Sequence, residues 1–336
     1  VDRAEPGDLV LIDVGTYGES VVVSQPGITI RGVDRNGVVL DGAHELEDGF
    51  LVTADGVAIE NLTVRNFVAD GVAFDGTQGD RAPDGDGAFG TEDASLVGFR
   101  VAYVTAANNG RYGIHALSSR DGLVEEVYAS GHPGAGVAVS QCSPCNALVT
   151  TTVAERNGIG FAGLNASGSL FVVDGVYRGN RLGVAIATAG SLLLAPQAGS
   201  VVGGNLVEDN DDPEAPASSL GVTGGGIVVV GGTENVVVRN RVSAHDVLGI
   251  GLVVGRDRDH LDLFELVLAQ HPARVAPGRA RLRAEAGRIR GEAQRQFLQV
   301  EDLVGREIGQ RHFRGRDEPQ PGRGAEQVLA ELRQLP

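Results

Sequence analysis

Along the first 250 residues, a glycine followed at once by a short apolar run recurs at regular spacing. The glycines of these runs are Gly71, Gly113, Gly136, Gly160, Gly183, Gly226 and Gly249. Their intervals are 42, 23, 24, 23, 43 and 23 residues. Two intervals therefore equal one repeat plus an insertion, and the underlying period is near 23 residues. Each unit holds two or three strand-sized runs, such as VAIENLTV, NALVTTTV and NVVVRNRV.

One turn of a coil with three short strands needs about this many residues, and stacked turns form parallel sheets with a strand spacing of about 4.8 Å. Asparagines recur in the segments between the runs: Asn66, Asn108, Asn109, Asn157, Asn180 and Asn210. Asparagine tolerates left-handed backbone, and its amide can bond to the amide of the next turn. The pattern predicts an all-β, right-handed parallel β-helix, the hand following the usual crossover preference. It fits neither a propeller nor a leucine-rich repeat.

Strand alternation predicts which side chains lie inside the coil. The expected interior positions are Ile114, Val137, Val139, Phe161, Val184 and Ile186. One outward row is Ala73, His115, Ala138, Ala162, Ala185 and Val228, and the next is Asp75, Leu117, Ser140, Leu164, Ala187 and Val230. We also expect Glu60, Arg100, Glu125, Glu126 and Arg178 to form solvated ion pairs between turns, each contributing less than about 1 kcal/mol.

Composition narrows the function classes. The chain has 50 glycines and a net charge of −16, and all of its basic residues are arginine. An acidic body repels phosphate backbones and anionic lipid, so we expect no nucleic-acid or membrane-surface partner. No apolar run is long enough for a transmembrane segment. The chain starts at Val1 and contains no methionine, so we expect any signal peptide to lie outside it.

Composition changes near residue 255. Residues 1–255 carry a net charge of −18 and residues 256–336 one of +2, and the latter contain no Ser, Thr, Asn or Tyr. We therefore divide the chain into a β-helix, 1–254, and an Arg-rich segment, 255–336. That segment is either helical, for example at HLDLFELVLAQH and AEQVLAELRQL, or disordered, or an out-of-frame translation of GC-rich DNA. We favour the last interpretation, which sequencing of the DNA would test.

The opening AEPGDLVLIDVGTYGESVVVSQPGITIRG resembles the first turns of bacterial secreted parallel β-helix proteins of the pectin-lyase-like superfamily. The resemblance covers roughly residues 1–254. It implies the fold and an exported protein, either periplasmic, secreted or at the cell surface, but it does not specify an activity. It also implies that VDRA is the last turn of an amphipathic N-terminal cap.

Two insertions interrupt the repeat. The first, 75–93, follows the strand after Gly71, and the second, within 191–225 and including NDDPEAPASSLG, follows the strand after Gly183. We expect both to emerge from the same edge, four turns or roughly 19 Å apart. The hypothesis is a groove for polysaccharide or cell-surface glycan, walled by these loops and floored by the turns between them. The substrate-binding candidates are His115, Arg120, Asp121, Gln141 and Asn165.

Catalytic candidates are weaker. A carboxylate such as Asp121, Asp84 or Asp86 would act as general acid or base. The segment SGHPGAG resembles the Gly-His-Gly of polygalacturonases, which would make His132 catalytic, but that family's other motifs are missing. Asp212-Pro213-Glu214 also falls short of the alginate-epimerase motif. The alternative for both segments is an ordinary turn.

Metal and thiol chemistry have one candidate each. Hard oxygen ligands for Ca²⁺ are available in the first insertion, at Asp80, Asp84, Asp86, Glu92 and Asp93, although the EF-hand spacing is not met. The alternative is a solvated acidic loop. Cys142 and Cys145 are the only cysteines. We interpret them as a structural disulfide, because zinc needs two further ligands; free thiols and a metal site are the alternatives.

Two functions stay open at this point. The first is a glycan-binding or glycan-processing β-helix, as a lyase or glycoside hydrolase if it is catalytic. The second is a non-catalytic scaffold or accessory protein. Two carboxylates at glycosidase spacing would favour the first. We expect a monomer.

Overall fold

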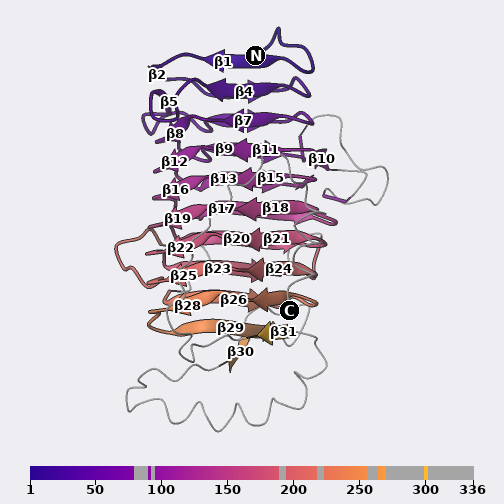
Figure 1. Ribbon diagram of the computed structural model, residues 1–336, viewed down its shortest axis with the longest axis vertical. Helices are drawn as coiled ribbons and strands as arrows, with labels where there is room; N and C mark the ends of the chain where they lie inside the picture. The colour runs from indigo at the N-terminus through magenta and orange to yellow at the C-terminus, as the bar shows by residue number, and fades with distance from the viewer. Residues whose placement is uncertain are drawn as a thin grey trace, which may run out of the picture.

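The computed structural model describes residues 1–78, 90–91, 95–188, 194–217, 223–255, 264–269 and 299–301. Over these residues the chain coils through three sheets that run along the long axis of the molecule, with the N-terminus at one end (Figure 1). We call them sheets A, B and C, in the order in which each turn of the coil passes through them, and call each turn a rung. None of the described residues forms a helix of the length and apolarity that a bilayer span requires.

Each rung contributes one strand to each sheet. Sheet A consists of β1 (Leu9–Ile12), β4 (Thr29–Gly32), β7 (Ala58–Glu60), β11 (Arg100–Ala102), β15 (Leu123–Glu125), β18 (Ala147–Thr150), β21 (Leu170–Val173), β24 (Ser200–Gly203), β27 (Val236–Val238) and β31 (Gln299–Glu301). Sheet B consists of β2 (Gly15–Tyr17), β5 (Val38–Asp41), β8 (Thr63–Arg65), β12 (Thr105–Ala107), β16 (Tyr128–Ser130), β19 (Val153–Glu155), β22 (Val176–Arg178), β25 (Leu206–Glu208) and β28 (Arg241–Ser243).

Sheet C has the longest strands. It consists of β3 (Val21–Val23), β6 (Phe50–Val52), β9 (Val72–Asp75), β13 (Tyr112–Leu117), β17 (Ala135–Cys142), β20 (Ile159–Ala166), β23 (Leu182–Ala187), β26 (Gly225–Val230), β29 (Leu248–Gly255) and β30 (Phe264–Ala269). A small pair, β10 (Leu96–Val97) with β14 (Ser119–Arg120), lies beside it, where the chain passes from sheet C to sheet A.

The register confirms the predicted repeat. The parallel Cα partners in sheet C include Val72↔Ile114, Ile114↔Val137, Val137↔Phe161, Phe161↔Val184, Val184↔Ile227 and Ile227↔Ile250. These steps reproduce the intervals between the glycines of the sequence pattern, insertions included. The all-β, parallel β-helix fold is therefore confirmed.

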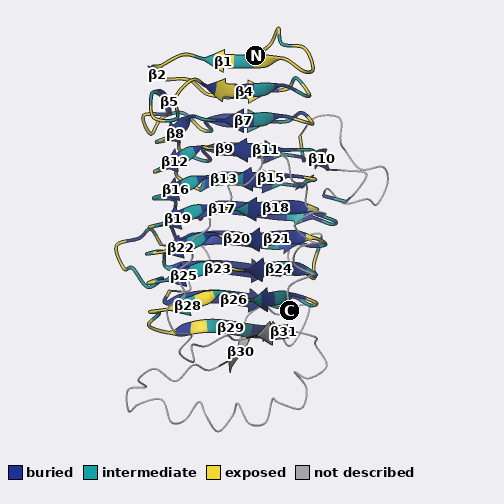
Figure 2. Cartoon of the chain, viewed as in Figure 1, coloured by how far each residue is buried: buried dark blue, intermediate teal, exposed yellow. Residues whose placement is uncertain are grey.

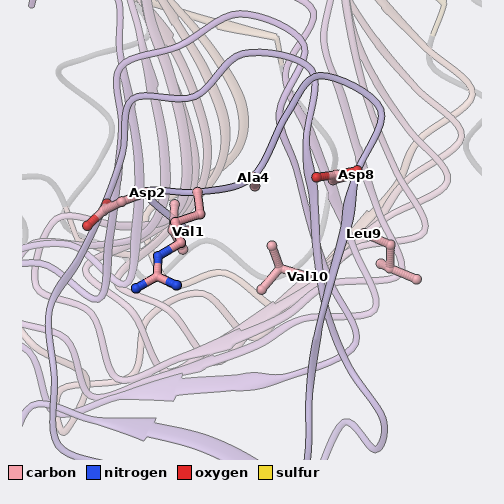
Figure 3. Close-up of a pocket in the computed structure, with 7 residues that line it drawn as sticks. Val1, Asp2, Ala4, Asp8, Leu9 and Val10 are labelled. Carbon is pink, nitrogen blue, oxygen red and sulfur yellow. The ribbon is translucent and has the colours of Figure 1, made fainter.

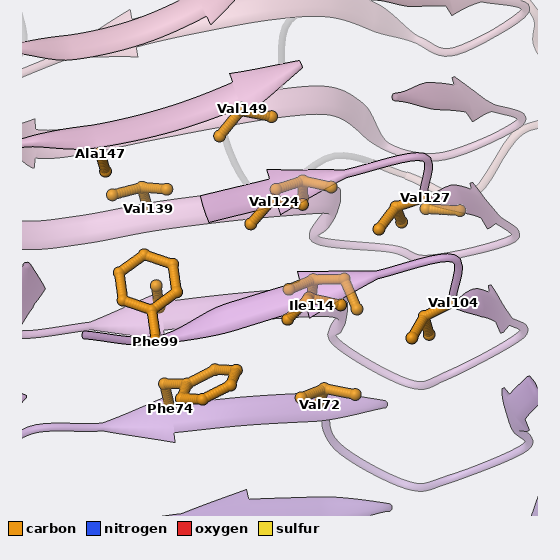
Figure 4. Packing of buried hydrophobic residues seen from close by; sticks show 14 of the residues in the cluster. Val72, Phe74, Phe99, Val104, Ile114, Val124, Val127, Val139, Ala147 and Val149 are labelled. Carbon is orange, nitrogen blue, oxygen red and sulfur yellow. The ribbon is translucent and has the colours of Figure 1, made fainter. Parts of the chain in front are cut away.

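The interior of the coil is a continuous apolar core. All six side chains that alternation placed inside belong to it and are buried. Phe74 and Phe99 pack with ring centroids 5.4 Å apart, and valine and isoleucine side chains from successive rungs stack beside them (Figure 4). Burial is lowest in the first rung and high through the middle of the coil (Figure 2). The core thus makes one rigid rod that holds surface side chains at fixed positions.

Asparagines serve the turns in two ways. Asn66 and Asn108 adopt left-handed backbone after their sheet B strands, with φ of 57° and 52°. A second group stacks inside the turn between sheets B and C, where Asn157 Nδ2 donates to Asn180 Oδ1 (3.1 Å) and Asn180 Nδ2 donates to Asn210 Oδ1 (2.8 Å). These three side chains are fully buried. We call this stack the asparagine ladder; both predicted roles of asparagine are confirmed.

Two strands are described in the C-terminal segment. β30 pairs antiparallel with β29, and β31 pairs in parallel with β27. The helical interpretation of HLDLFELVLAQH is therefore wrong at Phe264–Ala269, because the last strand of a sheet offers unpaired backbone groups that this apolar run satisfies. The rest of 256–336 lies outside the described residues, and the origin of the segment stays a prediction.

The repeating glycine has a steric reason, which gives a prediction. A Cβ at position 160 would lie 2.5 Å from the carbonyl oxygen of Gly183 on the next rung. We expect Gly160→Ala to lower the free energy of unfolding by about 2 kcal/mol, the usual cost of overpacking, because backbone yields less readily than a side chain. Urea unfolding followed by circular dichroism measures this. Gly18→Ala is the control, since its Cβ would meet nothing closer than 4.0 Å; equal effects of the two changes would contradict the explanation.

Candidate functional site: a polar network on the outer face of sheet C

The outer face of sheet C divides into a polar and an apolar part. The register confirms the two predicted outward rows, so His115 lies between Ala73 and Ala138, and Ser140 lies between Leu117 and Leu164. Toward the C-terminal rungs the same face is apolar, with Ile159, Ala162, Leu182, Ala185, Val228, Leu248 and Val253 in one cluster. Polar side chains therefore gather on β9, β13 and β17.

His115 is the centre of the polar part. Its neighbours in the row, Ala73 and Ala138, carry only methyl groups, so the imidazole can tilt along the strands. Its Nε2 lies 2.8 Å from Oγ of Ser140 on the next rung, and its Nδ1 lies 3.2 Å from Oδ2 of Asp70 on the preceding rung. The Tyr112 ring packs against the imidazole with centroids 4.5 Å apart. The ring is thus held between two polar partners.

Asp70 is a fully buried carboxylate whose oxygens are all engaged. Arg111 donates from Nε to Oδ1 (2.8 Å) and from Nη2 to Oδ2 (2.7 Å), and the Tyr112 N–H donates to Oδ1 (3.1 Å). Burial by itself would raise the pKa of Asp70, but hydrogen bonds from His115 and Arg111, with the charge of both, lower it below the ordinary value. Asp70 is therefore ionised at neutral pH.

This ionisation determines the tautomer of neutral His115. A carboxylate only accepts, so Nδ1 must carry the proton that it donates to Asp70. Nε2 is then unprotonated and accepts from the Ser140 hydroxyl. A second carboxyl group borders the network: Asp48 Oδ1 accepts the Asp70 N–H at 2.8 Å, and burial raises the pKa of Asp48. In this arrangement the Ser140 hydroxyl donates to the imidazole of His115, and the imidazole donates to the carboxylate of Asp70.

Sheet C is bordered by insertions at both edges. Residues 76–95 and 188–199 lie where the chain passes from sheet C to sheet A, whereas residues 209–224 lie between β25 and β26, where it passes from B to C. The expectation that NDDPEAPASSLG shares an edge with the first insertion is therefore wrong: the sequence interval contains two insertions, and their lengths alone could not separate them. The first two approach each other, because a Cβ at Gly90 would lie 3.0 Å from Leu194 Cδ1.

Three of the predicted site residues lie together at the edge between sheets C and A. Arg120 pairs with Asp121, whose Oδ1 also accepts from Asn146 Nδ2 (3.1 Å). Two buried atoms there, Arg120 Nε and Gln141 Oε1, have no hydrogen-bond partner among the described residues. Because both atoms are buried, a ligand would contact other atoms of these side chains, such as the guanidinium end of Arg120, whose side chain is 19% exposed.

Two other predicted site residues, Asn165 and His132, are buried. Asn165 is fully buried, so it does not present its side chain to a substrate. His132 is also fully buried and continues the asparagine ladder: its Nδ1 accepts the Asn109 N–H (3.2 Å) and its Nε2 lies 3.2 Å from the Ala106 carbonyl. Burial lowers its pKa to about 4. Full burial of His132 argues against the catalytic expectation and favours the turn interpretation.

The cysteine interpretation is confirmed, whereas the calcium hypothesis falls on undescribed residues. Cys142 and Cys145 form a buried disulfide at the turn after β17. The calcium candidates Asp80, Asp84, Asp86, Glu92 and Asp93 lie outside the described residues, and so do Asp84 and Asp86 as catalytic candidates. Within the described ranges, no three His, Cys, Asp or Glu side chains form a group that could hold a metal ion.

A pocket at the N-terminal end is a poorer candidate. It is lined by Val1, Asp2, Arg3, Ala4, Asp8, Leu9 and Val10 (Figure 3). Its lining includes two carboxylates and one guanidinium but no imidazole, hydroxyl or thiol. It also lies on the first rung, while His115 lies on the fourth strand of sheet C. We therefore assign the candidate site to the network around His115.

Sequence reasoning found His115 but missed its partners. Asp70 and Arg111 were not considered, and Ser140 was noted only as an outward position. One signal was available for Asp70. The residue before each repeating glycine is otherwise Tyr112, Ala135, Ile159, Leu182, Gly225 or Leu248, so an acid at this place departs from the pattern.

Comparison with known proteins addresses the fold. Residues 87–260, more than half of the chain, match the family model described as right-handed β-helix region. Similar solved structures include pectate lyase Pel9A, with 12% identity over 75% of this chain and 67% of that chain and a TM-score of 0.43. Another is the alginate lyase AlyGC, with 14% identity over 72% of this chain and 38% of that chain and a TM-score of 0.44. A third is the A-module of mannuronan C-5 epimerase AlgE4 from Azotobacter vinelandii, with 15% identity over 73% of this chain and 73% of that chain and a TM-score of 0.42. This chain thus spans well under half of AlyGC. No curated protein sequence matches significantly.

Proposed function

Because this chain belongs to the right-handed β-helix family, we propose that it binds and processes polysaccharide on the outer face of sheet C. The observation that carries the proposal is the Asp70–Arg111–His115–Ser140 network, which lies on the sheet whose two edges bear the insertions. Stacked rungs offer an extended ligand a repeated surface, and Arg120 and Asp121 lie at one edge of it. A polysaccharide-processing protein of this kind acts outside the cell, and proteins exported to oxidising compartments commonly carry disulfides, as this chain does.

The outer faces of sheets A and B have a different character. On sheet A, a chain of ion pairs across rungs joins Arg31, Glu60, Arg100 and Glu125. Glu60, Arg100 and Glu125 were expected to pair, but Glu60 is buried and not solvated as expected. On sheet B, Arg178 pairs with Glu155 and Arg65 pairs with Asp41. These charges are paired with one another, whereas the network on sheet C joins a hydroxyl, an imidazole and a buried carboxylate, which supports sheet C as the working face.

Charge favours one class of polysaccharide. Residues 1–255 carry a net charge of −18, which repels a polyuronate chain. A neutral polysaccharide meets no such repulsion. We therefore assign neutral chains as the preferred class, with polyuronates retained only when calcium screens the charge.

The test compares two arginines that are each paired with an aspartate. Arg111, with a side chain 54% exposed, pairs with Asp70 on sheet C; Arg65, 44% exposed, pairs with Asp41 on sheet B. Affinity electrophoresis of the full chain in neutral and acidic polysaccharides, with and without calcium, should show retention by a neutral polymer. Arg111→Gln should weaken it at least about ten-fold, the value of a charged hydrogen bond, whereas Arg65→Gln should not. A scaffold would show no retention, or equal loss in both variants.

A further inference from the structure

We propose that Ser140, His115 and Asp70 form a nucleophile–base–acid triad that hydrolyses esters. It deepens the proposed function, on which it rests only for the natural substrate, an acyl ester carried by a neutral polysaccharide. The three residues come from different rungs: Asp70 precedes β9, His115 lies in β13 and Ser140 lies in β17. Coiling of the chain brings them into one line across the face of sheet C.

The geometry meets the requirements of such a triad. The nucleophile–base distance, Ser140 Oγ to His115 Nε2, is 2.8 Å, and the base–acid distance, His115 Nδ1 to Asp70 Oδ2, is 3.2 Å. Both ring nitrogens are engaged from opposite sides, so the hydroxyl and the carboxylate share one imidazole. Ser140 is 5% exposed and the His115 side chain 11%, so each is largely buried but keeps a small accessible surface, whereas Asp70 keeps none.

The chemical step follows from the assigned tautomer. Ser140 Oγ bonds to the ester carbonyl carbon as its proton passes to His115 Nε2. The bond from that carbon to the sugar oxygen then breaks, and His115 returns the proton to the departing oxygen, which leaves an acyl-serine. Water attacks the acyl-serine by the same proton transfers and releases a carboxylic acid and free Ser140. Asp70 does not touch the substrate; it is a positioning residue that stabilises the imidazolium formed in both steps.

Surrounding groups hold the base in place. Arg111 binds both oxygens of Asp70, which keeps the carboxylate ionised and fixes the oxygen that faces His115. The Tyr112 ring lies against the imidazole, and the methyl groups of Ala73 and Ala138 flank it in the row. A histidine that only filled space would need none of these contacts in this order.

The test uses the full chain and two probes that need no knowledge of the polysaccharide. A fluorophosphonate should label Ser140, identified by peptide mass spectrometry, and p-nitrophenyl acetate should be hydrolysed. Ser140→Ala should abolish labelling and lower kcat at least about 10³-fold, as expected for loss of the nucleophile. The matched control is Ser130→Ala, a serine at the end of β16 on the outer face of sheet B, which should change neither readout.

Two further variants separate catalysis from structure. His115→Ala should lose hydrolysis and regain part of it with added imidazole, which a merely structural role would not produce. Asp70→Asn should shift the pH profile of kcat and not only its height, because the carboxylate stabilises protonated His115. Circular dichroism confirms that each variant is folded.

The outcomes distinguish this proposal from the broader one. A chain that binds polysaccharide but is neither labelled nor hydrolytic overturns the triad and leaves polysaccharide binding standing. A chain that is labelled at Ser140 and cleaves the nitrophenyl ester, yet binds no polysaccharide, supports the triad and overturns the proposed function. Labelling of another serine, or hydrolysis that survives Ser140→Ala, overturns the triad.

Discussion

Replacing Asn180 by alanine is expected to lower the free energy of unfolding by about 4 kcal/mol, because it removes the centre of the asparagine ladder. Asn180 Oδ1 accepts the Asn157 N–H (2.9 Å), and Asn180 Nδ2 donates to the Ala154 carbonyl (3.0 Å). Alanine withdraws these contacts and the amide bonds to Asn157 and Asn210 in a place that water does not reach. Buried groups that lose their partners bear the full cost of desolvation.

Urea unfolding of the full chain, followed by far-ultraviolet circular dichroism, measures this change. Asn36→Ala is the matched control, since Asn36 is exposed and its hydrogen bond to Asp34 uses only the backbone N–H. The control should stay within about 0.5 kcal/mol of the unchanged protein. If both variants unfold at the same urea concentration, the ladder contributes no more than a surface turn.

A second large effect concerns pH. His132 is neutral in the fold with a pKa lowered to about 4, whereas an unfolded histidine titrates near 6.5. Between pH 6.5 and 4, His132 binds a proton in the unfolded chain but not in the folded one, so the free energy of unfolding falls as the pH drops. Below about pH 4 both states are protonated at His132, and this residue causes no further loss. The loss attributable to His132 is on the order of 3 kcal/mol.

His132→Asn should remove this dependence and keep the fold. Asparagine supplies the same two contacts, as Asn157 shows one rung on, where Oδ1 accepts the His132 N–H (3.0 Å) and Nδ2 donates to the Ala129 carbonyl (3.1 Å). Unfolding free energies at several pH values between 4 and 8 give the slope, and the exposed His44→Asn is the control. Other groups titrate in the same range, so the difference between variant and parent is the quantity to read. Parallel curves would show that His132 is not the cause.

The repeat made most of the fold predictable. A period near 23 residues predicts the length of one rung, and alternation predicts which side chains of each strand point inward. Ile114, Phe161 and Ile186 are in the core as predicted. The disulfide was also predictable, because two cysteines on one turn lack the further ligands that a zinc site needs. These features depend on neighbours in the sequence or on a fixed interval, and a sequence displays both directly.

The site was predictable only in part. The row that contains His115 was correct, but rows say nothing about which side chains tilt across them. His115 reaches diagonally to Ser140 because Ala138, directly opposite, leaves room. Their positions in turns correctly predicted one shared edge for Arg120, Asp121 and Gln141. The burial of Asn165 was not predicted, because the side chain of a turn residue can point inward or outward.

By itself, then, the sequence determined the period, the inner and outer faces of the strands and the disulfide, since each follows from spacing along one chain. Tertiary structure alone decided that Asp70, 45 residues from His115, is its partner, that His132 continues a ladder, and that residues 209–224 lie at the opposite edge of sheet C. The physical reason is common to all three. Insertions and turns change how many residues separate neighbouring rungs, so contact across rungs depends on the register of the folded coil and not on a constant interval.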